Sequence, residues 1–594
     1  MELYENGRPS FSGGLKKTLA IDLRSLAVFR VLIALAVIAN IVTLLPQVGA
    51  FLAEDGVFSR TDAMAYRSAH YFSLYYVSGA NWYALLLLAA TLCAALALLF
   101  GFYTRVATVL TWFLVASLNN RISIAAYGGD TQLTLLLFWS MFLPLGARFS
   151  VDAALAKDQG SDNYFSVATV AILLQVAYLY FIGALLKNGS FWVESFDAVY
   201  YAITSIQVSS PFAGWLTVIP DLPVWLTVYV YFLELLAILF LFFPAFFQYT
   251  RAFVLPQLIA MHLGFAIFLA VGLFPLISIS GLTLFIPALF WDRVLPWWNG
   301  RKSRRGIKIF YDKDCGFCFK TCLIFRTLSL PATTPILKAQ EYEASNRILA
   351  EQGSWSVLTH DGRYLSRWAA VAYVWRRSPL LWPLGVLFIL PLMARIGDLL
   401  YEQIGRNRAA LGRFTSKVLP FRSRVIFRLN RATSWALAGL IALVYVWNVE
   451  TVRRADMVPD RLKALLATLR LTQHWNMFAP QPVYVSRWVV VEGVLGDGSV
   501  VDLLHGESST PSHEKPSHGY RAFPSQRWRK FYERVDITEE RETLGRYYCS
   551  QAKNASYEPV ESVAIYSYRL ATPPRGSSVV ASPELTAQAV FECQ

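Results

Sequence analysis

Cys315 and Cys318, two cysteines separated by two residues, form the pair in this sequence with the clearest capacity for chemistry. The apolar, β-rich run 307–311 precedes them and a helix-compatible stretch follows, so we expect a strand that leads into a helix beginning at the pair. A helix N-terminus favours the thiolate form of a cysteine, which is the nucleophile in disulfide exchange. The spacing therefore predicts a redox dithiol in which Cys315 attacks and Cys318 resolves the mixed disulfide.

Asp312, Asp314 and Cys322 surround the pair and are its predicted supporting residues. Cys322 follows Cys318 by four residues, which places both on the same face of the expected helix. A structural zinc site is the alternative interpretation, but it needs a second pair of ligands. Residues 301–431 contain neither a second Cys-x-x-Cys nor a His pair, so the sequence favours the redox interpretation and no metal is predicted.

The composition is that of a protein solvated largely by lipid. Hydrophobic residues make up 55% of the 594 residues and charged residues only 16%, compared with about 25% charged residues in soluble domains. The formal net charge is +14. Lys and Arg in cytoplasmic loops explain this positive charge through the positive-inside rule, so nucleic acid is not expected as a partner.

Nine apolar runs qualify as possible membrane spans. The first follows Lys16, Lys17 and Arg24 and has no small-residue cleavage site after it, so we interpret it as a span and not as a secretory signal. Basic residues lie at alternate ends of the runs, and the positive-inside rule then places 47–80, 119–131 and 187–222 outside. The expected fold is a polytopic α-helical membrane protein of about eight spans plus one more. The runs are 26–46, 82–100, 106–118, 132–146, 164–186, 223–244, 252–271, 273–291 and 434–449.

The ninth run separates two further predicted domains. Residues 403–449 carry eight basic residues and no acidic one, so the part before the run is expected to stay in the cytoplasm. Beyond it, 483–492 and 499–504 flank the turn Gly496-Asp497-Gly498 and predict a β-hairpin. The predicted domains of this multi-pass protein of a bacterial inner membrane are a transmembrane domain (1–300), a cytoplasmic α/β dithiol domain (301–431), an additional transmembrane helix (432–450) and a β-rich extracytoplasmic domain (451–594).

One apolar stretch inside the dithiol domain resembles a further span. Residues 378–395 are mostly apolar, but Pro379, Pro383 and Pro391 interrupt them. The run is also too short to cross a bilayer as a helix. We therefore expect a buried or interfacial helix in this place.

Polar side chains within or beside the apolar runs are the second set of candidates, because a charge in lipid is costly and is a functional hypothesis by default. Lys187 ends the fifth run, where partial desolvation favours a neutral amine that can act as a base. The alternative for Lys187 is a lysine that snorkels to the interface. For Glu234 and His262, the alternative to a functional role is an interhelical hydrogen bond. The remaining candidates are Arg30, expected to pair with an acidic residue such as Asp22, and Asn120, Arg121 and Asp130 between the third and fourth runs.

The residues around the cysteine pair resemble a known family. Tyr311-Asp312-Lys313-Asp314-Cys315-Gly316-Phe317-Cys318 is similar to the signature of the DCC-type thiol-disulfide oxidoreductases, a thioredoxin-like group. The segment 362–408, which ends Tyr-Glu-Gln-Ile-Gly-Arg-Asn-Arg, is similar to the C-terminal part of that family. The family usually has glycine where this sequence has Lys313. The resemblance implies a thioredoxin-like fold and thiol-disulfide exchange at Cys315 and Cys318.

The membrane part resembles the HTTM group, to which vitamin K-dependent γ-carboxylase belongs. The likeness covers roughly 20–295 and the start of the tail. Residues 180–187, Tyr-Phe-Ile-Gly-Ala-Leu-Leu-Lys, followed by Trp192-Val193-Glu194, are similar to the carboxylase segment that carries its catalytic lysine. Further matches are 22–30, Gly128-Gly129-Asp130, His262 with Gly272-Leu273-Phe274-Pro275, and Gln473-His474-Trp475-Asn476-Met477-Phe478-Ala479-Pro480.

The resemblance to the carboxylase implies a reaction for Lys187. A lysine base deprotonates a reduced quinone (menaquinone or a vitamin K-like hydroquinone), and the anion reacts with oxygen. The strong base that results removes a proton from a glutamate, which captures carbon dioxide. Trp192, Glu234 and His262 are then candidates for binding substrate or cofactor, with Arg30, Asn120, Arg121 and Asp130.

Together these observations predict a membrane redox enzyme. On this hypothesis a lipid-soluble quinol binds near Lys187, and its oxidation drives modification of an exported peptide or protein held by the tail. The dithiol domain handles electrons on the cytoplasmic side, so the two sites are expected at opposite faces of the membrane. One alternative is a thiol-disulfide oxidoreductase anchored by an inert bundle, which predicts that Lys187→Ala changes nothing. Another is a non-enzymatic maturation or export factor that binds a client protein.

Overall fold

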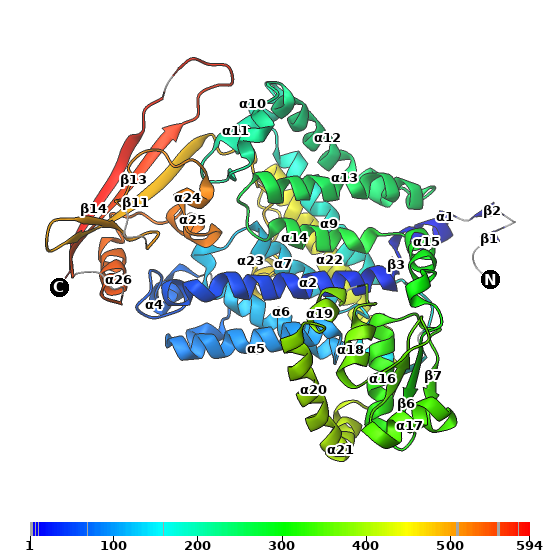
Figure 1. The fold of residues 1–594 in the computed structure, drawn as a ribbon. Helices are drawn as coiled ribbons and strands as arrows, with labels where there is room; N and C mark the ends of the chain where they lie inside the picture. The colour runs from blue at the N-terminus through cyan, green and yellow to red at the C-terminus, as the bar shows by residue number, and fades with distance from the viewer. Residues whose placement is uncertain are drawn as a thin grey trace.

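The computed structural model describes residues 4–5, 8–9, 11–67, 69–158, 160–379, 381–506, 510–554, 559–579 and 581–593. The N-terminal half is mostly helical, and the C-terminal half contains two small four-stranded sheets. Figure 1 shows a central helical bundle with a small α/β domain towards one end and a sheet-containing domain at the other.

Local capping sets the ends of the apolar helices in the bundle. α2 (Leu23–Leu44) begins after Asp22, whose carboxylate accepts the amide of Arg24 at 2.8 Å. α5 (Asn81–Phe100) ends at Gly101, which has a φ of 66°, the left-handed conformation that glycine tolerates best. The other elements of this part are α1 (Phe11–Leu19), α3 (Val48–Phe51), α4 (Arg60–Tyr66), α6 (Thr104–Arg121), α7 (Gly128–Ser140), α8 (Val151–Ala154), α9 (Val167–Leu186), α10 (Ser190–Val193), α11 (Ala198–Thr204), α12 (Leu222–Phe242), α13 (Phe247–Phe268), α14 (Phe274–Leu282), α15 (Ala288–Asn299), β1 (Tyr4–Glu5), β2 (Arg8–Pro9), β3 (Ile21–Asp22), β4 (Ala156–Asp158) and β5 (Asn163–Tyr164).

Within the described residues, six helices are long and apolar enough to cross a membrane. They are Leu23–Phe51, Asn81–Phe100, Val167–Leu186, Leu222–Phe242, Phe247–Phe268 and Arg431–Arg453, and each covers all or most of one of the predicted runs. The chain is therefore a multi-pass membrane protein.

The three other predicted runs take different forms. The run 106–118 lies in α6, whose last turn is Asn119-Asn120-Arg121, and this polar end lowers its mean hydropathy. The run 132–146 contributes α7, whose 13 residues span only about 20 Å, less than the roughly 30 Å of a bilayer core. The run 273–291 is bent by 96° between Phe274–Phe285 and Ala288–Asn299, and counting this pair as one span gives seven.

The α/β domain has the strand–dithiol–helix order that the sequence predicts. β6 (Lys308–Tyr311) leads into Cys315, which caps α16 (Gly316–Ser329). The sheet order is β7-β6-β8-β9, with β6 parallel to β7 and antiparallel to β8. The remaining elements of this region are β7 (Ile336–Lys338), α17 (Glu343–Gln352), β8 (Ser356–Leu358), β9 (Tyr364–Ser366), α18 (Arg367–Trp375), α19 (Trp382–Leu387), α20 (Pro391–Arg406), α21 (Arg408–Val418) and β10 (Arg422–Arg424).

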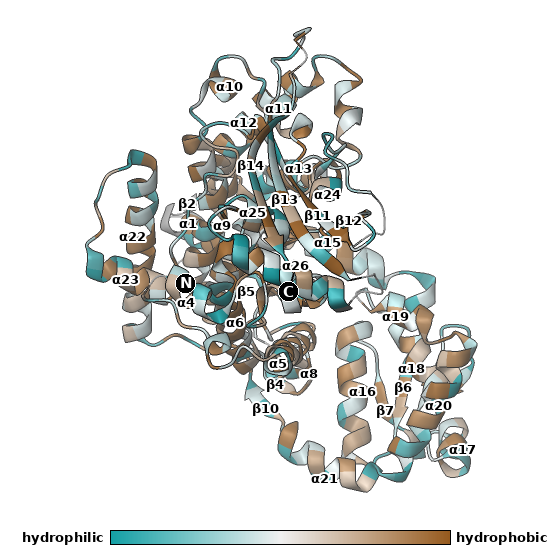
Figure 2. Cartoon of the chain, turned by 90° about the vertical axis from the view of Figure 1, so that its left-hand side faces the viewer, coloured by the Kyte–Doolittle hydropathy of each residue, from teal (hydrophilic) through white to brown (hydrophobic). Residues whose placement is uncertain are grey.

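Specific contacts hold this domain to one end of the bundle. β10 pairs in parallel with β4, and Arg422 forms an ion pair of 3.1 Å with the buried Asp152. The hydroxyl of Tyr164, just before α9, donates to the carbonyl of Phe427 at 3.1 Å. The domain is thus anchored beside the start of α9. Figure 2, a view from the side of the C-terminal domain, shows it displaced to one side of the bundle.

The C-terminal part follows α22 (Arg431–Arg453) and contains an antiparallel sheet in the order β12-β11-β13-β14. The predicted hairpin is confirmed, because β11 (Val485–Leu495) pairs with β12 (Val500–Asp502). α26 packs on the sheet, and a β-carbon at Gly545 would come within 2.2 Å of the Phe591 ring. A disulfide between Cys549 and Cys593 fastens this helix. The other elements are α23 (Asp460–Thr468), α24 (Gly519–Ala522), α25 (Gln526–Tyr532), α26 (Arg541–Asn554), β13 (Val560–Ala571) and β14 (Glu584–Glu592).

Candidate functional site

Lys187 and Glu234 form a buried ion pair at the far end of α9. Lys187 is the residue that ends α9, and its ammonium donates to the carboxylate of Glu234 on α12. Their side chains are only 7% and 9% exposed. Two charges removed from water in this way are stable only when they are paired and hydrogen-bonded. Sequence reasoning named both residues, and the structure brings them together.

A second pair, Tyr180 and His262, lies on the neighbouring helices. The Tyr180 hydroxyl is 2.8 Å from Nε2 of His262 on α13, and both side chains are buried. Tyr180 precedes Lys187 by seven residues, which places the two on one face of α9. The other ring nitrogen of His262, Nδ1, is buried without a hydrogen-bond partner in the described part of the chain.

Aromatic rings surround His262. The rings of Phe265 and Phe274 meet the imidazole edge to face, with centroids 5.6 and 5.7 Å away. Gly183, three residues after Tyr180 on α9, lies beside the Lys187 amine, since a β-carbon there would be 3.8 Å from the Lys187 nitrogen. The two pairs therefore belong to one cluster, formed where α9, α12 and α13 meet and walled by apolar rings.

The start of the tail closes this cluster from the side of the C-terminal domain. The ammonium of Lys187 lies 5.1 Å from the centre of a Trp192 ring, in the range of a cation–π contact. The indole of Trp192 donates to the carbonyl of Phe478 at 2.7 Å, and the amide of Gly189 donates to the carbonyl of Pro480 at 3.1 Å. Residues 473–480 thus contact the lysine segment directly.

The same tail segment is bound to the middle of the bundle through two glutamines. The side-chain amide of Gln175 on α9 donates to the oxygen of Gln473 at 2.7 Å. The indole of Trp475 donates to that oxygen at 2.8 Å, and the indole of Trp139 on α7 donates to Gln175 at 3.2 Å. All four side chains are buried. Segments 298 residues apart in sequence therefore share one polar network in an apolar environment.

Asp130 belongs to a different buried network. Arg527 of α25 donates to both carboxylate oxygens of Asp130, at 3.1 and 3.3 Å, and to Asn40 of α2 at 2.8 Å. The Arg527 and Asp130 side chains are almost wholly buried. This network docks the C-terminal domain into the bundle, and the structure does not show it joined to the Lys187 pair.

Arg30, Asn120 and Arg121 bind backbone carbonyls. Arg121 donates to the carbonyl of Phe58 at 2.8 Å, and the amide of Asn120 donates to that of Phe72 at 2.6 Å. These contacts hold the loop before α5 against the end of α6. They indicate a structural role for the two side chains.

The expected partner of Arg30 was wrong. Asp22 instead pairs with Arg24, at 2.7 Å. Arg30 donates to the carbonyls of Leu145 and Arg148, both at 3.1 Å, and to that of Phe149. The orphan carbonyls where the chain turns after α7 attract the guanidinium, because it offers several donors at fixed angles.

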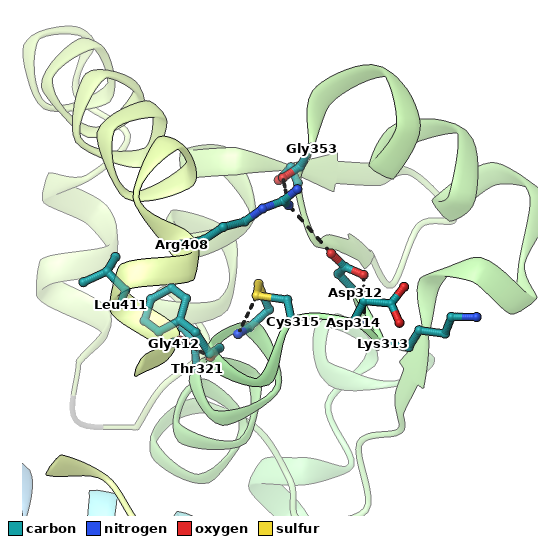
Figure 3. The surroundings of a disulfide bond; sticks show 12 residues. Asp312, Lys313, Asp314, Cys315, Thr321, Gly353, Arg408, Leu411 and Gly412 are labelled. Carbon is teal, nitrogen blue, oxygen red and sulfur yellow. Dashed lines mark hydrogen bonds and ion pairs between the residues drawn. A yellow bond between two sulfur atoms is a disulfide. The ribbon is translucent and has the colours of Figure 1, made fainter. Parts of the chain in front are cut away.

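The dithiol site lies at the exposed N-terminus of α16 (Figure 3). Cys315 and Cys318 form a disulfide, and the amide of Cys318 also donates to the Cys315 sulfur at 3.2 Å. Asp312 accepts the side-chain amide of Gln340 at 2.8 Å and lies 3.7 Å from Arg408.

Neighbouring residues shape the entrance to the disulfide. Asp314 and Lys313 are exposed, and in Figure 3 they lie on one side of Cys315 while Leu411 and Gly412 of α21 lie on the other. Cys315 and Cys318 are thus partly exposed next to a mixed acidic and basic surface.

Cys322 lies apart from this disulfide in the core of the domain. It is 1% exposed and packs with Ile309, Val357 and Val374. Burial raises the pKa of its thiol well above the ordinary value. Such a thiol stays protonated and unreactive at neutral pH, so the position of Cys322 is that of a core residue.

Sequence reasoning missed Arg527, Gln175 and the Cys549–Cys593 bridge. Only the bridge left a signal, since two cysteines in a predicted extracytoplasmic domain are candidates for a disulfide. Nothing local in the sequence distinguishes Arg527 from the other arginines of the tail.

The helical bundle and the partly exposed disulfide define a membrane protein with a redox-type dithiol domain. Comparison with known families agrees with this class. Residues 19–290 match the HTTM domain, and residues 309–414 match the DCC1-like thiol-disulfide oxidoreductases. The chain is therefore a fusion of an HTTM domain with a DCC1-like thiol-disulfide oxidoreductase domain. No curated protein and no solved structure matches it significantly.

Proposed function

We propose that this membrane redox protein is an enzyme that oxidises a reduced quinone with oxygen at the Lys187 cluster and uses the reaction to modify an exported peptide or protein. The single observation that carries the proposal is the buried Lys187–Glu234 pair beside Tyr180 and His262. Paired titratable groups in a closed, apolar site are what proton-transfer chemistry requires.

The residues present fit a quinol. The buried Nδ1 of His262 has no hydrogen-bond partner among the described residues, and a phenolic hydroxyl is a suitable partner for it. Phe265 and Phe274 supply aromatic surface around His262, and Trp192 supplies it beside Lys187. A bound quinol would supply two electrons and two protons for the reduction of oxygen, and carbon dioxide would be a further substrate if the product is a carboxylated residue.

Each residue of the cluster has a role on this proposal. Lys187 acts as the base once the ion pair has released one proton and the amine is neutral. The amine then takes the quinol proton, and Glu234 stabilises the ammonium that re-forms. Tyr180 orients the imidazole of His262 through their 2.8 Å bond, so that the free ring nitrogen points towards the ligand. Trp192 and the tail at Phe478 exclude water from the amine.

The sidedness of the protein is part of the proposal. The Cys549–Cys593 disulfide supports an oxidising compartment for the C-terminal domain, such as the outer side of a bacterial inner membrane. The basic residues of 403–431, which have no acidic counterpart, support a cytoplasmic dithiol domain. Cys315 and Cys318 then exchange electrons on the reducing side, and a diffusing quinone is the link between the two sites.

A second function is favoured by one specific observation. The dithiol domain is attached beside the start of α9, whereas Lys187 ends the same helix. A 20-residue helix separates them by about 30 Å. Disulfide exchange at Cys315 therefore does not require the residues of the Lys187 cluster. The alternative is a membrane-anchored thiol-disulfide oxidoreductase.

Oxygen uptake by the full-length protein in lipid separates these functions. We expect uptake on addition of reduced menaquinone, a loss of about 10²–10⁴-fold in Lys187→Ala, and no loss in Cys315→Ser. Lys463→Ala is the matched control, because Lys463 also pairs with carboxylates but at the surface. The absence of uptake with every reduced quinone would refute the proposal, and disulfide exchange that requires Cys315 would then support the alternative.

A further inference from the structure

A helical hairpin on the dithiol domain exposes an apolar surface that the domain itself does not cover. Residues 378–394 contain no charged side chain. α19 lies within this stretch and α20 begins in it at Pro391. The two helices are joined near Ile389, and the segment 382–406 that they form is called the hairpin. Large apolar side chains are exposed throughout this hairpin: Trp382, Leu384, Val386, Leu387, Ile389, Leu390 and Leu392.

The exposed surface continues along one stripe of α20. Leu392, Ile396, Leu399, Leu400 and Ile404 are all exposed, and their spacing of four, three, one and four residues places them on one side of the helix. The stripe is about 20 Å long, because an α-helix rises 1.5 Å per residue.

A different side of α20 makes the contacts with the domain. A β-carbon at Gly397 would collide with the Trp368 ring, which shows how closely the helix packs there. The hydroxyl of Tyr401 is 2.8 Å from that of Ser354. The apolar stripe is therefore additional to the core, and a soluble domain rarely leaves such a continuous patch in water.

The position of the hairpin indicates what covers it. Figure 2 shows the dithiol domain to one side of the bundle, and Figure 1 shows α19 next to the crossing helices, with α20 running from there away from the bundle. The space beside crossing helices belongs to lipid. α15, bent by 96° from α14, carries Trp297 and Trp298 next to Arg301 before the domain begins. Tryptophans beside a basic residue are typical of a membrane interface.

The charges around the hairpin suit a lipid surface as well. Arg376 and Arg395 are both exposed and lie just outside the uncharged stretch 378–394. Basic residues at the edge of an apolar segment reach the headgroups while the apolar part enters the acyl region. Asp398 and Glu402 lie on the side of α20 away from the stripe, where they would face water.

We propose that the α19–α20 hairpin inserts into the lipid leaflet on the dithiol-domain side and holds this domain against the membrane surface. The domain then has a third attachment to the membrane besides the chain segments at its two ends. The inference does not depend on the reaction at Lys187. Its consequence is that Cys315 and Cys318 keep a fixed orientation at the bilayer surface, within reach of membrane-bound partners.

Spin labels on the full-length protein in nanodiscs containing anionic lipid test the insertion. Ile389→Cys places a label on the hairpin, and Asp398→Cys places the matched control on the polar side of α20, both in a Cys93→Ser background. Without reductant, the two disulfides and the burial of Cys322 keep the other cysteines unlabelled. Collisions with oxygen, which concentrates in lipid, are compared with collisions with a water-soluble nickel chelate.

The expected result is a label at position 389 that collides mainly with oxygen, while the label at 398 collides mainly with the chelate. Equal access of the chelate to both positions would overturn the proposal and place the hairpin in water. A label at 389 that neither reagent reaches would also overturn it, since the apolar surface would then be covered by protein. Repeating the Ile389 measurement at Leu399→Cys checks that the stripe on α20 follows the hairpin.

Discussion

The dithiol site and the Lys187 cluster differ in how far along the chain their residues come from. Cys315 and Cys318 lie on one helix turn, and the strand before them and the helix dipole supply the chemical environment locally. The Lys187 cluster joins α9, α12 and α13 with Trp192, and residues near Phe478 close it.

This difference explains why the two sites respond to change in different ways. A local motif keeps its geometry as long as its helix forms, whereas a cluster assembled from distant segments depends on every contact that holds those segments together. In lipid, each buried charge must also have its partner. We therefore expect substitutions in the bundle to act on stability and function together, and substitutions at the dithiol to act on function alone.

The largest effect is expected from Glu234→Gln. It leaves the Lys187 ammonium buried without its carboxylate, and breaking such a pair costs about 3–5 kcal/mol. The double variant Lys187→Met/Glu234→Leu should recover most of the lost stability, because both charges are gone, but not the oxygen uptake. Thermal unfolding in detergent, followed by tryptophan fluorescence, measures both variants. A Glu234→Gln protein as stable as the wild type would contradict the contrast between the two sites. The stability of the bundle would then depend on the Lys187 cluster no more than the stability of the dithiol domain depends on its cysteines.

A smaller loss is expected from Arg527→Met at the junction of the bundle and the C-terminal domain. It leaves the Asp130 carboxylate buried and unpaired, at a cost of about 3 kcal/mol, and should loosen α25 before the rest of the protein. Hydrogen exchange of residues 519–532 reports the change. Arg569→Met removes an exposed ion pair with Glu584 and should leave exchange unaltered. If both variants behave alike, Arg527 does not dock the domain.

The disulfide of the C-terminal domain should contribute somewhat less. Replacing Cys549 and Cys593 by alanine opens a link between residues 44 positions apart, and such links stabilise by about 2–4 kcal/mol. We expect the domain to unfold at a lower temperature while dithiol exchange at Cys315 is unchanged. Non-reducing mass spectrometry of the wild type shows whether the bridge is present, and two free thiols there would contradict the expectation.

The smallest expected effect concerns Cys322. It tests whether the reactive dithiol consists of Cys315 and Cys318 without this third cysteine. Burial raises the pKa of this thiol above the ordinary 9.0, so in the reduced protein an alkylating reagent should modify Cys315 and Cys318 well before Cys322. The same shift means that the domain loses stability as pH rises through 9, because the thiol ionises in the unfolded chain and not in the folded one. Rates of alkylation between pH 7 and 10 test both points. If Cys322 were alkylated as fast as Cys315, Cys322 would have to be counted among the reactive thiols of the redox site.

Some features of this protein follow from short segments of sequence, and these were predicted. The strand before Cys315, the hairpin around Gly496-Asp497-Gly498 and six of the long apolar helices are specified by local pattern. Lys187, Glu234 and His262 were named because a polar group within an apolar run is costly wherever it lies. The shape of the run 273–291 was not foreseen, since apolar composition does not distinguish a straight span from one bent by 96°.

The pairing of these groups depends on the packing of the whole chain. Composition and spacing identify which side chains need a partner in lipid, but the partner of Lys187 lies 47 residues away and that of Asp130 lies 397 residues away. Arg30 illustrates the limit, because its need for acceptors was clear while the choice of backbone carbonyls over Asp22 was not. Local sequence shows which polar groups need a partner in lipid. The folded arrangement of helices and tail determines which atom binds each of them.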